Sequence, residues 1–206
     1  MSNNISRVAA LTLACAAAIG FSVQADAAKT RLHATGTRAA NGQVTHVRGT
    51  RVSGPNGSTG GHASKTSYGA DGSVTHNGGT NVTGANGGTA HGQNTYTKNA
   101  DGSSEFTRSV NGTTANGTDF SHSKDWTKSA GGTPQGTSTT SVTGANGGTY
   151  NSTTTGANGT ATRDSSATSK NGGTYTGTTT YTKGEGVSHT GTCTDASGKS
   201  VTCPTH

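Results

Sequence analysis

Asn-Gly and Asp-Gly pairs recur along this chain at a fixed interval of fifteen residues. The pairs are Asn41 and Gly42, Asn56 and Gly57, Asp71 and Gly72, Asn86 and Gly87, Asp101 and Gly102, Asn116 and Gly117, and Asn146 and Gly147, with Gly131 in the slot before the last pair. Such dipeptides adopt positive φ at low cost and favour tight hairpin turns. The spacing therefore predicts a repeat protein whose elements are joined by regular turns.

The segments between these turns carry β-branched and aromatic residues at every second position. Thr95-Tyr96-Thr97 and the run from Thr178 to Thr182 are examples, and no helical periodicity competes with them. We expect an all-β protein of roughly ten to twelve strands in series. The regular repeats cover residues 28–157, and shorter repeats of about thirteen residues fill 158–206.

The turns alternate between two chemistries, so the full unit is thirty residues. Val52-Ser53-Gly54-Pro55-Asn56-Gly57 returns as Val82 to Gly87 and as Val142 to Gly147, while Ala40 to His46 returns as Ala70 to His76. Two architectures fit this alternation: a repetitive β-hairpin meander, or a β-solenoid with one or two repeats per coil. A meander also leaves two free sheet edges, which invite strand addition by another copy.

Apolar residues are too few for an ordinary globular core. Only 26% of the chain is hydrophobic and 4% aromatic, against 34 glycines. We expect backbone ladders and stacked columns of Thr and Asn to replace a thick core. The carboxylates are few and scattered, and the hydroxyls are too abundant for any one of them to indicate a catalytic site. The composition disfavours an enzyme, and it also leaves open a largely disordered chain.

Residues 1–27 have the layout of a secretory signal peptide. Arg7 is the basic start, Val8 to Phe21 the apolar run, and Ala25-Asp26-Ala27 a small-x-small cleavage site. An alternative is a lipid anchor on Cys15. We expect a secreted protein, extracellular, at the cell surface or periplasmic, with no transmembrane span after the signal is removed.

The formal net charge of +6 favours anionic partners such as surface polysaccharide, lipid head groups or extracellular DNA. The competing interpretation is that scattered charges only keep a polar chain soluble. We expect no cofactor.

Two small groups of residues are candidates for specific chemistry. Cys193 and Cys203 flank Gly198 symmetrically, which predicts a disulfide-closed hairpin in an oxidising compartment; the alternative is a metal site with His189 and His206. His46, His76 and His91 occupy one slot, five residues after a turn. In a coil, His76 and His91 would stack and bind a metal ion, whereas in a meander His46 and His76 align two strands apart. The alternative is that these histidines only occupy exposed strand positions.

The Thr-Gly-Ala-Asn-Gly-Gly-Thr motif, at 83–89 and 143–149, resembles the Gly/Asn/Thr-rich secreted β-repeat proteins of Gram-negative bacteria. An analogy also holds with curli-like amyloid subunits, although their Ser/Gln/Asn repeat pattern is absent. This resemblance implies a non-enzymatic structural or surface protein that self-associates or adheres to matrix polymers, for example in a biofilm. The alternatives are a binding module for metal ions or anionic polymers, and a largely disordered envelope or stress protein.

Overall fold

The computed structural model describes residues 28–38, 42–54 and 56–203. The expected signal peptide, Asn41 and His206 lie outside these residues.

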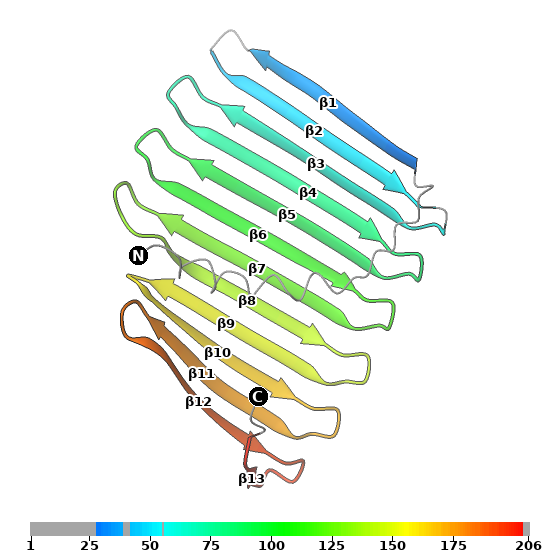
Figure 1. Cartoon of the computed structure of the whole chain (residues 1–206), viewed down its shortest axis with the longest axis vertical. Helices are drawn as coiled ribbons and strands as arrows, with labels where there is room; N and C mark the ends of the chain where they lie inside the picture. Colours follow the sequence, from blue (N-terminus) through cyan, green and yellow to red (C-terminus); the bar gives the residue numbers. More distant parts are fainter. Residues whose placement is uncertain (1–27, 39–41, 55, 204–206) are drawn as a thin grey trace.

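The described chain forms one antiparallel sheet of thirteen strands, hydrogen-bonded in chain order (Figure 1). The strands are β1 (Ala28–Arg38), β2 (Val44–Ser53), β3 (Thr59–Tyr68), β4 (Val74–Thr83), β5 (Thr89–Lys98), β6 (Ser104–Thr113), β7 (Asp119–Lys128), β8 (Gln135–Thr143), β9 (Thr149–Ala157), β10 (Thr160–Thr168), β11 (Thr174–Thr182), β12 (Gly186–Thr194) and β13 (Ser200–Val201). The all-β expectation is confirmed, and the meander is the architecture observed. It exceeds the expected strand number by one, the two-residue β13.

Most turns are three-residue loops in which only the glycine has positive φ. In the loop after β4, the Gly87 amide donates to the Gly84 carbonyl at 3.0 Å, and the Gly84 amide to the Gly88 carbonyl at 2.7 Å. Gly87 has φ of 85°. This is a type I turn followed by a glycine bulge. A ten-residue strand and a five-residue connection make the fifteen-residue period.

The turn at Asn158 and Gly159 is the two-residue kind. Both residues have positive φ, 51° and 82°, and Ala157 pairs directly with Thr160. Asn158 is the one non-glycine residue with positive φ among the described residues. In the other described turns glycine alone has positive φ. This shorter connection, with nine-residue strands on either side, explains why the repeat contracts after Asn146.

The sheet has two chemically different faces, because cross-strand partners and alternate residues of a strand share a side. We call the side that carries Trp126 the aromatic face and its opposite the threonine face. The aromatic face holds every aromatic residue of β2–β13 other than histidine and every valine but Val47: Val44, Val52, Tyr68, Val74, Val82, Tyr96, Phe106, Val110, Phe120, Trp126, Val142, Tyr150, Tyr175, Tyr181, Val187 and Val201.

The apolar side chains pack sideways on this single layer. A Cβ added to Gly156 would lie 2.6 Å from Cη2 of Trp126, and one added to Gly112 would lie 2.7 Å from Cζ of Phe120. The Phe120 ring therefore reaches Gly112 on the neighbouring strand β6, and the Trp126 indole reaches Gly156 on β9, two strands away. The expected low core is observed: among the described residues that are not glycine, Cys193 and Ser152 alone are buried, at 8% and 7% exposure.

Replacing Gly156 with alanine should destabilise the sheet, because the new methyl group displaces the indole of Trp126. We expect a loss of about 1–3 kcal/mol in the free energy of unfolding, measured by urea denaturation. Gly60→Ala is the matched control, since Gly60 lies on the same face with no atom within 4 Å of an added Cβ. Equal losses for the two variants would contradict the packing of Trp126 on Gly156.

Candidate binding faces of the sheet

Charge is segregated between the two faces of β2–β13. Six cations lie on the aromatic face with no carboxylate: Arg48, Lys98, Arg108, Lys124, Lys128 and Arg163. All four strand carboxylates lie on the threonine face with two cations: Glu105, Asp119, Asp125, Asp164, Arg51 and Lys65. The strands that carry apolar rings on one side thus also carry a positive field on that side.

The densest combination of rings and cations lies on β5, β6 and β7. Register places nine residues in three parallel rows, which we call the central patch: Lys98, Ser104 and Lys128; Tyr96, Phe106 and Trp126; Asn94, Arg108 and Lys124. Three aromatic residues therefore occupy one row, with two cations in the row on either side. The rings are half-buried, while Arg108 and Lys98 are exposed.

Within the central patch, two like charges face each other directly. Arg108 pairs with Lys124 across β6 and β7, an arrangement that is destabilising for a sheet unless an anion neutralises it. The Lys124 ammonium lies 5.1 Å from the Trp126 ring centroid and 5.9 Å from that of Phe106. Cation–π attraction holds the lysine over the rings but supplies no counter-ion.

Two further polar groups lie in this region. Burial, followed by the charges of Arg108 and Lys124, lowers the pKa of His122 below its ordinary value. The His122 ring Nδ1 lies 3.0 Å from the Thr140 hydroxyl. Nε1 of Trp126 is buried and finds no hydrogen-bond acceptor among the described residues. The patch thus presents positive charge with no strand carboxylate on its face to balance it.

Threonine is more concentrated on the threonine face than strand propensity alone explains. Of the twenty threonines on β8–β12, seventeen lie on this face, while Thr140, Thr154 and Thr179 lie on the other. Both faces belong to the same strands and therefore share one backbone propensity. The asymmetry is a property of the surface, which is polar, hydroxyl-rich and nearly uncharged in this region.

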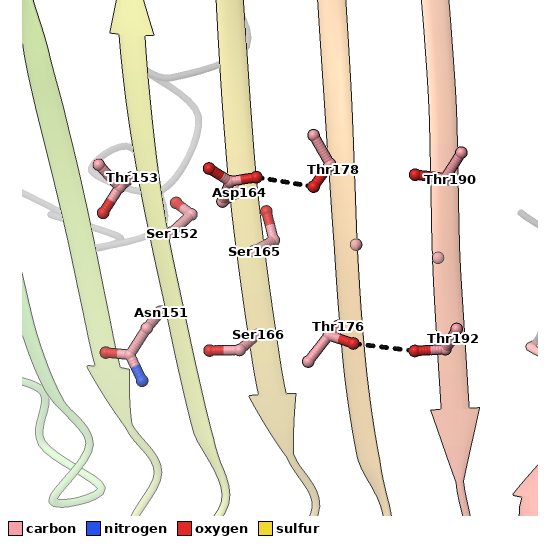
Figure 2. A pocket seen from close by; sticks show the side chains of 12 residues that line it. Asn151, Ser152, Thr153, Asp164, Ser165, Ser166, Thr176, Thr178, Thr190 and Thr192 are labelled. Atoms are coloured by element: carbon pink, nitrogen blue, oxygen red, sulfur yellow. Dashed lines mark hydrogen bonds between the residues drawn. The ribbon is translucent and has the colours of Figure 1, made fainter.

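Part of this array lines a shallow hollow of about 570 Å³ (Figure 2). Two adjacent rows cross β9–β12 there: Thr153, Asp164, Thr178 and Thr190; Asn151, Ser166, Thr176 and Thr192. Thr178 donates to the Asp164 carboxylate at 2.7 Å, and the Thr176 and Thr192 hydroxyls lie 2.9 Å apart. The hydroxyls bond one another, so the array offers an organised hydrogen-bonding surface to water or a polar partner.

The histidine slot divides between the two faces. His46 and His76 share a row of the aromatic face, separated by Thr66, whose hydroxyl lies 2.8 Å from Nδ1 of His76. His91 lies on the threonine face and bonds to Asn81. The stacking of His76 with His91, expected for a coil, is therefore wrong for this meander. Among the described residues, no group of three or more His, Cys, Asp or Glu is placed to hold a metal ion.

Cys193 and Cys203 form a disulfide, with Cα atoms 5.3 Å apart. The intervening turn begins at Asp195, whose carboxylate accepts from the Ser197 amide at 2.9 Å. The hydrogen bond from the Ser197 side chain, first among several, lowers the pKa of Asp195.

Within the described part of the chain, no helix has the length and hydropathy of a membrane span.

Sequence reasoning identified the turns but missed the central patch. The signal was present: antiparallel strands joined by a turn pair at positions equidistant from its centre, so Tyr96 pairs with Phe106 and Phe106 with Trp126. These pairs were missed because the sequence left the solenoid as an alternative, and a solenoid with one repeat per coil stacks residues that are fifteen apart.

Comparison with protein-family models, with curated proteins and with solved structures finds no match to the chain. The interpretation of the faces therefore rests on their own geometry.

Removing the two charges nearest His122 should raise its pKa. We expect Arg108→Ser/Lys124→Ser to move the NMR titration of the His122 ring upward, and Arg51→Ser/Lys65→Ser, on the opposite face, to leave it in place. The folded-state pKa of His122 lies below the unfolded value of about 6.5, so the unfolded chain binds this proton more readily. The free energy of unfolding therefore rises as the pH increases from the folded-state pKa toward 6.5, and falls again on acidification. An unchanged titration in the first variant would refute the assignment of these charges.

Proposed function

We propose that this is a secreted, non-enzymatic structural repeat protein that assembles into extended sheets by edge-to-edge strand pairing. The observation that carries the proposal is the open sheet, which ends in β1 on one side and in β12 with the short β13 on the other (Figure 1). Secretion is inferred from the basic, apolar and small-residue pattern of residues 1–27.

The β12 edge supports pairing with another copy. β13 pairs only with Cys193 and Thr194, so the stretch from Gly186 to Thr192 has β11 on one side and no described strand on the other. These seven residues are all exposed, and Val187 is 70% exposed. Unpaired backbone donors and acceptors along an exposed edge are a template for another strand.

The direction of the strands makes repeated addition possible. In a meander, odd-numbered strands run one way and even-numbered strands the other, so β1 of a second copy is antiparallel to β12 of the first. Such a junction continues the alternation and keeps each face on its own side. The contact is head-to-tail, which generates open filaments rather than closed dimers. The disulfide hairpin lies at this edge and limits which part of β12 is accessible.

A lysine at the β12 edge should block this assembly. We expect Val187→Lys to reduce thioflavin fluorescence and fibre content of the processed protein, residues 28–206, since edge charges oppose strand addition. Thr153→Lys is the control, because Thr153 is exposed on the central strand β9 and the charge change is equal.

The readouts are thioflavin fluorescence, light scattering after size exclusion, and fibre diffraction at the 4.7–4.8 Å strand spacing. A wild-type protein that stays monomeric at raised ionic strength, where the repulsion between chains of charge +6 is screened, would overturn the proposal. Equal assembly of the two lysine variants would refute the β12 edge as the junction.

A further inference from the structure

We propose that the central patch binds single-stranded nucleic acid, with bases stacked on Tyr96, Phe106 and Trp126 and phosphates held by the flanking cations. This inference concerns a face of the sheet and goes beyond the edge pairing of the proposed function.

The arrangement of the rings is the first argument. Tyr96, Phe106 and Trp126 belong to adjacent strands and share one row, so their Cα atoms follow one another at about the strand spacing of 4.7–4.9 Å, while the Trp126 indole extends toward Gly156 on β9. Each is half-buried, and the Lys124 ammonium lies over Phe106 and Trp126, so a base stacks on these two rings once Lys124 turns from them to a phosphate. Rings held in series on a rigid sheet provide a platform for successive unstacked bases.

The placement of the cations is the second argument. Lys98 and Lys128 lie in the row on one side of the rings, and Arg108 and Lys124 in the row on the other. The direct pairing of Arg108 with Lys124 is unfavourable in the free protein and becomes favourable once a phosphate lies between them. No strand carboxylate of β2–β13 lies on this face to compete for these cations.

The surface beside the rings has space for a nucleic-acid strand. A hollow of about 420 Å³ adjoins the patch, lined in part by Asn94, Phe106 and Arg108 and deepened by Gly92. The amide of Asn94, in the row beside the rings, supplies hydrogen-bonding groups there.

The chemistry favours an unpaired strand over other occupants. A duplex conceals its base faces, and an acidic polysaccharide offers carboxylates but no π-surface for three rings. A second copy laid on by its own aromatic face would oppose six cations with six, and each chain already carries +6 overall. Single-stranded nucleic acid matches both the rings and the charge.

Trp126 makes the test site-specific, because it is the one tryptophan of the chain. Titration of the processed protein with oligothymidylate should quench Trp126 fluorescence, and affinity should fall with rising salt. Arg108→Ser/Lys124→Ser should weaken binding roughly tenfold or more and reduce the slope of log K against log salt by about 1.4, the value for two phosphate contacts on a single strand.

Matched variants separate the site from net charge. Arg51→Ser/Lys65→Ser changes the net charge equally but on the threonine face, and should alter affinity by less than about twofold. Tyr96→Ser should weaken binding with the salt slope unchanged, whereas Tyr68→Ser, on the same face but outside the patch, should not. Urea denaturation confirms that each variant remains folded.

Three outcomes would overturn the proposal: absence of Trp126 quenching, equal losses in the two double-cation variants, or binding of a uronic-acid polysaccharide as tight as that of oligothymidylate. Val187→Lys, which tests the edge, should bind oligothymidylate with wild-type affinity. Failure of assembly and failure of nucleic-acid binding are therefore distinguishable.

Discussion

The absence of a second layer over the described sheet determines how the rest of this structure is built. In an ordinary sandwich, side chains of two sheets bury one another across a core. Here the backbone ladder supplies the continuity, and the Phe120 ring packs against Gly112 of the neighbouring strand β6, while the Trp126 indole reaches Gly156, two strands away on β9. Gly112 and Gly156 are consequently packing positions, although glycine alone weakens a strand. Apolar burial is spread thinly along one face.

That requirement also divides the two faces between different tasks. Rings and valines must gather on one side to contact one another, and the long cationic side chains lie beside them with their aliphatic stems over apolar surface. The threonine face carries no such apolar cluster and holds seventeen of the twenty threonines of β8–β12. Because acidic residues on the strands are confined to the threonine face, the segregation of charge follows the segregation of packing.

The sequence predicts the strands and turns of this fold because they are local. Asn-Gly spacing and alternating threonines determine turn positions, and the symmetric placement of Cys193 and Cys203 about Gly198 predicts their pairing. What sequence reasoning left open was the direction of the chain after each turn, which no local residue encodes. The same uncertainty placed His76 beside His91, although the meander puts them on opposite faces. The central patch needed three strands in known register, and the contact of Trp126 with Gly156 spans strands thirty residues apart.

The proposed edge pairing and the proposed binding by the central patch would reinforce each other. If copies join through β12 and β1, the central patch recurs once per copy, roughly 58 Å apart for twelve strands at the usual strand spacing. A long polyanion then meets a series of patches, and each bound patch raises the effective concentration of the strand at the next. Conversely, the bound anion neutralises the +6 charge that opposes the approach of another copy. On these two proposals, filament growth and polyanion binding are thermodynamically linked, and each is expected to promote the other through the cations of the central patch.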